Sequence, residues 1–405
     1  MKIRIPKLTT EHFFGIFLAI YWGQNIIFSY FRAIFQRIPY IKYFSNYIVP
    51  YMMMICLVLA VPYFIKVLRP SDIFFAGAVT VIVLLNIIIY PENESLTALV
   101  GSFFTSVFPL YFIGLRFESS KHFRILYIMS IVNIWAFAAY YLLIDGFTFS
   151  SAQAVSDSFM GRAYTLLPQI LVTVYWALKR KNVLNIITSI FGFVMLLMCG
   201  NRGSVVILLL FILIYIMFNT RGKNRFYLSA GALSIFAILT YFYNKLIVFI
   251  VSLFTKYGIN VRIFERIASG TFFESSGREL ILEKLKVAIF ENPFIGYGLC
   301  SDRTISGSYA HNYAVELWTA FGVVFGSIIL VITLYVIVKA LVKLRNSPNG
   351  GLLLILICAG FIKLFISSSF LLEGMFFMLI GYCVSQLRKS KFEVIEFGEN
   401  KNEDM

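Results

Sequence analysis

Three short polar segments interrupt an otherwise apolar chain, and each contains one side chain suited to chemistry. Arg202 lies in a glycine-flanked turn at residues 200–204, Arg278 follows a Ser-Gly pair, and His311 precedes Asn312. Arginine offers permanently charged, planar donors for phosphate oxygens, and a histidine with a pKa of about 6.5 can accept a proton at neutral pH. Taken singly, the arginines could instead be a membrane-surface anchor and a solvent-facing cation, and the histidine a structural hydrogen-bonding residue.

The chain that positions these residues has the composition of a membrane protein. Of its 405 residues, 60% are hydrophobic and only 14% are charged, which no soluble domain of this size would tolerate. Apolar runs of about 17 to 25 residues match the roughly 30 Å hydrocarbon core, and their lack of alternation excludes a β-barrel. The sequence therefore predicts an all-α, polytopic integral membrane protein with about twelve transmembrane helices. We place them near residues 12–31, 46–66, 72–90, 96–115, 124–144, 163–178, 183–199, 204–218, 226–244, 313–338, 351–369 and 371–387.

Lysine and arginine residues gather at the N-terminus and after every second predicted helix, which indicates the orientation of the chain. Short cytoplasmic loops collect positive charge, so we expect both termini to be cytoplasmic and the three polar segments to face outward. The net charge of +15 then follows largely from topology, and nucleic acid is not an expected partner. No cleavage pattern follows the first apolar run, so no cleavable signal peptide is expected.

The expected organisation is a single membrane domain, residues 1–405. It contains a large outer loop at residues 255–312 and ends in a cytoplasmic tail at residues 388–405. Outer loops of this length are usually functional.

The segment after Ser276 has the pattern of a capped helix. Ser276 and Glu279 have the spacing of a capping box, apolar residues recur at helical spacing as far as Ile289, and an Asn-Pro pair ends the run. The pattern predicts an amphipathic helix along the outer surface with Arg278 in its first turn. A helix N-terminus that carries an arginine is suited to phosphate.

Four motifs, in this order along the chain, resemble those of a known family. The sequence is similar to the O-antigen ligase and O-antigen polymerase superfamily of bacterial envelope glycan enzymes. The hydropathy layout resembles the family over the whole chain, and the specific motifs occupy about a quarter of it. They are Asn201-Arg202-Gly203, Ser276-Gly277-Arg278, Asn292-Pro293 with Gly296 and Gly298, and Ala310-His311-Asn312 before a span containing Gly322. Asn201 departs from the family pattern, in which serine or threonine often precedes the arginine.

The resemblance implies a membrane glycosyltransferase with a GT-C-like fold in the bacterial inner membrane. Its donor would be a glycan carried on undecaprenyl diphosphate. Arg202 and Arg278 would hold the diphosphate and stabilise it as it leaves, and His311 would position or deprotonate the acceptor hydroxyl. Further substrate-binding residues are expected beside these three: Gly203, Ser276 and Asn312. The partners expected besides the donor are membrane lipids and, from the same pathway, a chain-length regulator and a flippase.

Three further ionisable residues occur in or at the edge of predicted spans near the outer leaflet: Glu316, Lys363 and Glu373. Burying such groups is costly, so we hypothesise that they line a polar pocket for the acceptor sugar. A structural ion pair, such as Lys363 with Glu373, is the alternative.

The predicted outer segments contain no Asp-x-Asp motif and no dense cluster of carboxylates. Carboxylate oxygens are the ligands that divalent cations such as Mg²⁺ prefer. We therefore expect no metal and no cofactor, with the two arginines supplying the positive charge.

The expected reaction is polymerisation of lipid-linked repeat units into O-antigen or capsular polysaccharide. An O-antigen ligase would use the same donor and transfer the glycan to lipid A core, and the motifs do not separate these two acceptors. Polymerase is preferred because such enzymes are numerous and varied in sequence. A transporter or flippase for lipid-linked sugars is the alternative from another class, although the internal repeats and midplane charges typical of transporters are not evident.

Overall fold

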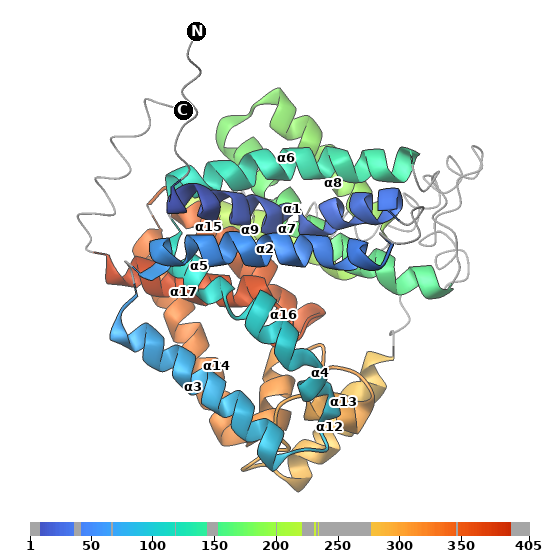
Figure 1. The fold of residues 1–405 in the computed structure, drawn as a ribbon, viewed down its shortest axis with the longest axis vertical. Coiled ribbons are helices and arrows are strands. Elements are labelled where there is room, and N and C mark those ends of the chain that lie inside the picture. The colour runs from blue at the N-terminus through green and yellow to red at the C-terminus, as the bar shows by residue number, and fades with distance from the viewer. Residues whose placement is uncertain are drawn as a thin grey trace. The chain divides into compact units, whose positions relative to one another are not determined.

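The computed structural model describes residues 9–35, 42–65, 68–117, 119–143, 153–199, 201–220, 231, 234, 277–345 and 347–389. Every regular element in these ranges is helical (Figure 1). Several of the helical segments are long and apolar enough to cross a membrane, which makes the chain an α-helical membrane protein, as its composition predicts. These segments are Pro70–Ile89, Glu94–Arg116, Lys121–Tyr140, Arg202–Asn219 and Tyr313–Leu344.

The helices belong to two compact units, each built from two separate stretches of chain. The first unit takes Met1–Lys66 and Glu118–Phe272, and the second takes Val67–Phe117 and Phe273–Met405. The predicted single membrane domain over residues 1–405 stays a prediction.

In the first unit, α1 packs against α2 and α6, and α6 packs against α7. Buried hydrogen bonds at Trp22 tie α1 to α6 and α7: Trp22 Nε1 donates to Ser130 Oγ at 2.8 Å, and Gln169 Nε2 donates to Trp22 O at 2.9 Å. Because these groups are buried among apolar side chains, pairing them avoids the cost of an unsatisfied donor. The unit consists of α1 (Thr10–Phe35), α2 (Lys42–Ile65), α6 (Ser119–Leu143), α7 (Gln153–Arg180), α8 (Val183–Met198) and α9 (Arg202–Asn219).

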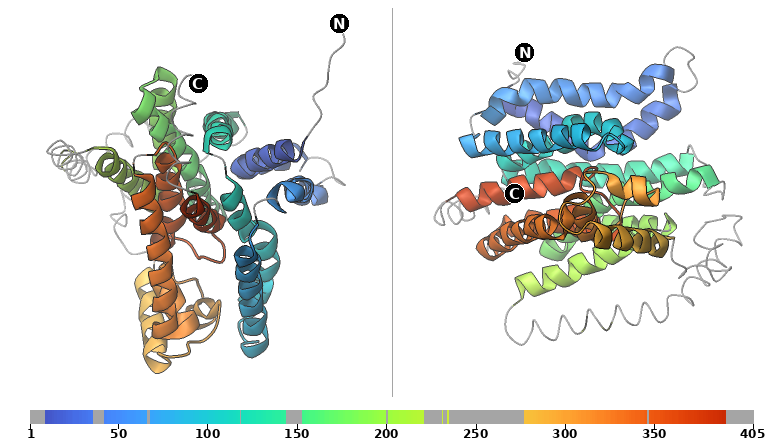
Figure 2. Two further views of the ribbon diagram at one scale, coloured as in Figure 1. Left: turned by 90° about the vertical axis from the view of Figure 1, so that its left-hand side faces the viewer. Right: turned by 90° about the horizontal axis from the view of Figure 1, so that it is seen from below.

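The second unit contains the longest helix, α14, with α12 beside its N-terminal part (Figure 2). Its α5 and α17 pack closely, since a Cβ added at Gly114 or at Gly381 would overlap backbone of the facing helix. The elements before the outer loop are α3 (Pro70–Ile89), α4 (Glu94–Ser102), the short π-helix η1 (Phe103–Val107) and α5 (Leu110–Arg116). Two described elements lie within the predicted outer loop, α12 (Arg278–Glu291) and α13 (Ser301–Ser306). Those after it are α14 (Tyr313–Leu344), α15 (Gly350–Leu356), the short π-helix η3 (Ile357–Ile362), α16 (Lys363–Ile366) and α17 (Gly374–Arg388).

Most of the described helices overlap predicted spans, whereas α12 and α13 lie in the predicted outer loop. The predicted span at residues 96–115 is interrupted by η1, the span at residues 351–369 is interrupted by η3, and α14 breaks at Gly322. Of the predicted span at residues 226–244, only residues 231 and 234 are described, and the predicted tail lies beyond the described residues after Lys389. The count of about twelve spans stays a prediction.

Candidate functional site

Arg278 is the first residue of α12, and its guanidinium contacts the end of another helix. Nη1 donates to Ile366 O at 2.6 Å, and Nη2 donates to Ser367 Oγ at 3.3 Å, where α16 ends. Carbonyls at a helix C-terminus lack intrahelical donors and carry partial negative charge, so they attract an arginine. The contact fixes the start of α12 to the end of α16.

The start of α12 differs from its prediction. Gly277, not Ser276, is the N-cap residue; it has a left-handed backbone with φ 76° and makes no side-chain cap. The predicted capping by Ser276 is therefore wrong, because the helix begins one residue later than a capping box with Glu279 requires. Ser276 itself lies outside the described residues, and its predicted contact with substrate stays a prediction.

The loop at residues 293–299, named here the 293–299 loop, is bound to α14 where that helix breaks. Gly322 has φ 74° and ψ 168°, which leaves carbonyls of the preceding turn without helical partners. Tyr297 N donates to Thr319 O at 2.8 Å, and Val323 N donates to Pro293 O at 2.6 Å. A Cβ at Gly322 would overlap the backbone of the loop, so this glycine is required by close approach. Gly322 thus has a structural role.

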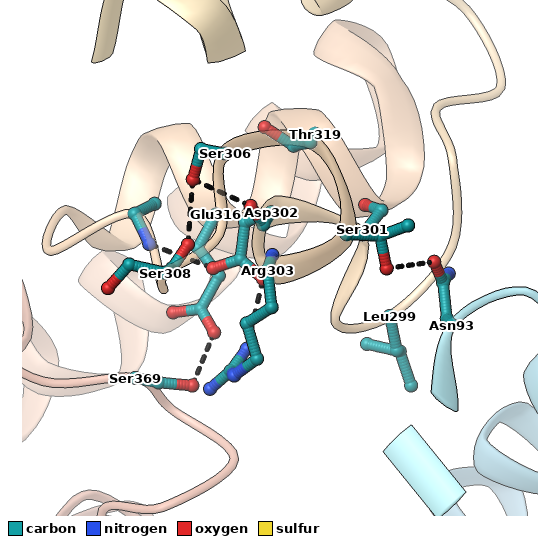
Figure 3. A network of polar contacts seen from close by, with 12 residues as sticks. Asn93, Leu299, Ser301, Asp302, Arg303, Ser306, Ser308, Glu316, Thr319 and Ser369 are labelled. Carbon is teal, nitrogen blue, oxygen red and sulfur yellow. Dashed lines mark hydrogen bonds and ion pairs between the residues drawn. The ribbon is translucent and has the colours of Figure 1, made fainter. Parts of the chain in front are cut away.

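Asp302 organises the segment that leads to His311. Its side chain is 2% exposed and accepts hydrogen bonds from Ala310 N at 2.8 Å, Arg303 N at 3.0 Å and Arg303 Nη1 at 2.9 Å. Figure 3 shows this cluster, with the Arg303 side chain extending from α13 toward Glu316 and Ser369. Burial raises the pKa of Asp302, while Arg303 and these donors oppose the rise. Asp302 holds the backbone immediately before His311 in place.

His311 is half-buried and has an unusual backbone, with φ 55°. Its ring lies 3.9 Å from the ring of Tyr309, measured between centroids, and the Arg303 guanidinium lies 5.8 Å from the Tyr309 centroid. The buried Nδ1 of His311 has no hydrogen-bond partner among the described residues. Burial, and secondarily the charge of Arg278, lower the pKa of His311 to about 4. The imidazole is therefore neutral at pH 7, and its lowered pKa makes it a weaker base than a solvated histidine.

Asn312 is the N-cap residue of α14. Its Oδ1 accepts hydrogen bonds from Ala314 N at 3.0 Å and Val315 N at 3.3 Å. This capping orders the turn that carries His311. The predicted contact of Asn312 with substrate stays a prediction.

Glu316, in the first turn of α14, is buried and bound to the segment that follows α16. Its Oε1 accepts a hydrogen bond from Ser369 Oγ at 2.5 Å, and its Oε2 accepts one from Phe370 N at 3.3 Å. Lys363 Nζ lies 2.5 Å from Glu373 Oε2, which also accepts a hydrogen bond from Ser368 Oγ at 3.0 Å. The ion pair expected as the alternative is thus present, and a sugar-binding role for these residues stays a prediction.

Arg202 and Gly203 belong to the first turn of α9, in the first unit. Asn201 is the N-cap residue of this helix, because its Oδ1 accepts a hydrogen bond from Ser204 N at 3.2 Å. Asparagine caps helices as well as serine does. Arg278 and His311 both belong to the second unit, and the participation of Arg202 and Gly203 stays a prediction.

Within the described part of the chain, no group of three or more His, Cys, Asp or Glu side chains is arranged to hold a metal ion. The expectation of a metal-independent site stays a prediction. The candidate site consists of Arg278, the neutral His311, and the Asp302–Arg303 pair that orders the backbone before His311.

The sequence-based interpretation assigned no role to four residues of this cluster: Asp302, Arg303, Tyr309 and Ser369. Asp302 and Arg303 are adjacent charged residues in a segment otherwise short of charge, and that pairing was the available signal. Ser369 carried no signal, because only the fold brings it to Glu316, 53 residues away.

Comparison of this chain with protein-family models, with curated proteins and with solved structures finds no match in any of the three.

Proposed function

We propose that the protein is a membrane glycosyltransferase that polymerises undecaprenyl-diphosphate-linked repeat units into O-antigen or capsular polysaccharide. The proposal rests on two side chains of the second unit: Arg278, whose guanidinium donates to Ile366 O at 2.6 Å, and His311, whose buried Nδ1 has no hydrogen-bond partner among the described residues. One residue supplies permanent positive charge for a diphosphate, and the other supplies a neutral base for a hydroxyl. Such a pair suits transfer from a lipid diphosphate to an alcohol.

In the proposed reaction, the acceptor hydroxyl oxygen attacks the anomeric carbon of the donor glycan. The bond between that carbon and the diphosphate oxygen breaks, and undecaprenyl diphosphate leaves with the electron pair. His311 takes the hydroxyl proton, and Arg278, with Arg202, stabilises the negative charge of the leaving diphosphate. No metal or other cofactor takes part in this scheme.

The finer parts of the proposal concern the setting of the reaction. We place about twelve spans in a GT-C-like arrangement in the bacterial inner membrane, with both termini cytoplasmic and the site on the outer face. A chain-length regulator and a flippase would act in the same pathway. Support for the placement of spans comes from α3, α8 and α9, which begin and end within a few residues of predicted spans.

The test uses purified protein, undecaprenyl-diphosphate-linked repeat units extracted from the source strain, and product size on a gel. We expect a ladder from the wild type and a loss of about 100-fold or more for Arg278→Ala, because a well-placed donor contributes about 3 kcal/mol. Lys286→Ala is the matched control, since Lys286 is an exposed cation on the same helix. A normal ladder from Arg278→Ala would remove Arg278 from the reaction.

Two other outcomes assign the remaining candidate functions. Transfer that requires added lipid A core would identify a ligase. Movement of labelled lipid-linked sugar across a vesicle membrane without bond formation would identify a flippase and overturn the proposal.

A further inference from the structure

The 293–299 loop and the end of α12 present large apolar side chains at the protein surface. Phe290 is 83% exposed, Phe294 is 69% exposed and Ile295 is 68% exposed. The opposite face of α12 is buried through Leu285 and Ile289. The helix is therefore apolar on two faces at its C-terminal end, which the prediction of an amphipathic helix along the outer surface does not explain.

The loop contacts α14 at the point where the side chains of that helix change from buried to exposed. Residues 313–322 contain no exposed side chain, whereas the exposed apolar residues of α14 begin at Val323. The hydrogen bond from Val323 N to Pro293 O places Phe294 next to this change. Beyond it the exposed apolar surface continues along the helix: Val324, Phe325, Ile328, Val331, Ile332, Leu334, Tyr335, Val338 and Val342.

The same loop also meets the end of a second apolar helix. Leu299 N donates to Asn86 Oδ1 at 2.8 Å, and a Cβ at Gly298 would overlap the Tyr90 ring. Apolar side chains of α3 are exposed as far as Ile89. Two helices with membrane-type surfaces therefore both reach the 293–299 loop.

The opposite ends of these two helices are bound to the end of α17. Arg388 Nη2 lies 2.6 Å from Asp72 Oδ1 at the start of α3, and Lys343 Nζ donates to Gln386 O at 2.8 Å near the end of α14. At about 1.5 Å per residue, α14 rises about 32 Å from Gly322 to Lys343, and α3 rises about 27 Å from Asp72 to Tyr90. Both lengths match the roughly 30 Å thickness of a bilayer's hydrocarbon core.

We propose that the 293–299 loop lies at one boundary of the hydrocarbon core and that Phe290, Phe294 and Ile295 insert among lipid acyl chains there. Lipid is the occupant because this apolar surface is continuous with the exposed surfaces of α3 and α14, both of membrane-spanning length. Glu316 lies about 9 Å beyond Gly322 along α14. The Asp302–His311 cluster is thereby held in the headgroup layer, where the diphosphate of a lipid-linked substrate would reside.

The proposal is tested by measuring the depth of position 294 in lipid nanodiscs. Phe294→Cys is labelled with the fluorophore NBD in a Cys56→Ser background, because the other native cysteines are buried. We expect a blue-shifted emission and a loss of fluorescence with acyl-chain nitroxide lipids, stronger for a nitroxide at carbon 5 than at carbon 12. Glu283→Cys, an exposed polar position on α12, is the control and should respond to aqueous iodide instead.

Two results would overturn the proposal. Quenching of position 294 by iodide as strong as at position 283 would place the loop in water. Protection from both quenchers, together with dimeric particles, would mean that a second copy of the chain covers the surface. Ile295→Cys repeats the measurement at a neighbouring exposed position if the first variant does not fold.

Discussion

Two buried Asp-Arg pairs in the second unit differ in how completely their hydrogen-bonding groups are used. Arg388 binds Asp72 with two nitrogens, at 2.7 and 2.6 Å, and Asp72 also accepts hydrogen bonds from Tyr111 Oη at 2.9 Å and Arg69 N at 2.9 Å. The guanidinium of Arg303 binds Asp302 through Nη1 alone, and its buried Nη2 has no partner among the described residues. We call the Asp72–Arg388 pair closed because Arg388 binds both carboxylate oxygens of Asp72. We call the Asp302–Arg303 pair open because Arg303 Nη2 has no partner among the described residues.

The difference shows that the Asp72–Arg388 pair is fully used by the fold, whereas a nitrogen of Arg303 is not used by the described residues. Buried polar groups in folded proteins are nearly always paired, so an unpaired one calls for an explanation. The Arg303 guanidinium and the His311 ring, each with a nitrogen that has no partner among the described residues, both lie near the Tyr309 ring. An oxygen-rich ligand, such as a sugar or a diphosphate, would supply the missing partners.

The largest expected effect is on stability, from Arg388→Gln. The substitution leaves the Asp72 carboxylate buried without its bidentate partner, and removing one member of a buried pair costs about 3 to 5 kcal/mol. We expect a marked fall in the free energy of unfolding, measured by denaturant titration in detergent.

Arg303→Gln is the matched variant for the open pair. Here we expect a smaller loss of stability, because only one guanidinium nitrogen of Arg303 contacts Asp302, and a raised KM for the glycan substrate. Equal stability losses in the two variants, with unchanged KM in Arg303→Gln, would remove the distinction between closed and open pairs.

An intermediate effect on activity is expected at Lys363 and Glu373, which form an ion pair in the second unit. Lys363→Glu and Glu373→Lys should each lower activity by about 10-fold or more, since each places like charges together in a partly buried position. The double variant restores opposite charges, and we expect it to recover most of the activity in the gel assay. Failure of the double variant, with the fold intact, would instead favour direct contact with the sugar.

The smallest expected effect is the change in activity and stability with pH that arises from the titration of His311. Because the pKa of His311 is lowered to about 4, the neutral base persists as the pH falls from 7, and activity should decline only near pH 4. Unfolding raises this pKa toward 6.5, so the unfolded state binds the proton first. The contribution of His311 to stability is therefore lost progressively as the pH falls from about 6.5 to about 4.

This titration is measurable by NMR, since the chain has three histidines and His12→Gln with His122→Gln leaves one signal. Arg278→Ala should raise the pKa of His311 slightly, because burial is the larger cause of its shift. An apparent pKa near 6.5 in the wild type would show that the imidazole is solvated and would weaken its role as a neutral base.

Local patterns predicted much of the fold, and they were least accurate where distant segments meet. Apolar runs located α3, α8 and α9 within a few residues, because the length of a span follows from bilayer thickness. The break at Gly322 was not predicted, since it depends on hydrogen bonds to the 293–299 loop. The capping box at Ser276 satisfied every local rule, yet the helix begins after Gly277.

The sequence by itself determined that the chain is helical, suited to the membrane, and equipped with arginines and a histidine in polar segments, because composition and periodicity are local properties. Only the tertiary structure decided that Asp302 fixes the backbone before His311, that Lys363 pairs with Glu373, and that Arg278 faces the end of α16. Burial and the positions of partners distant along the chain set the charge state of a side chain, and neither is contained in a local pattern.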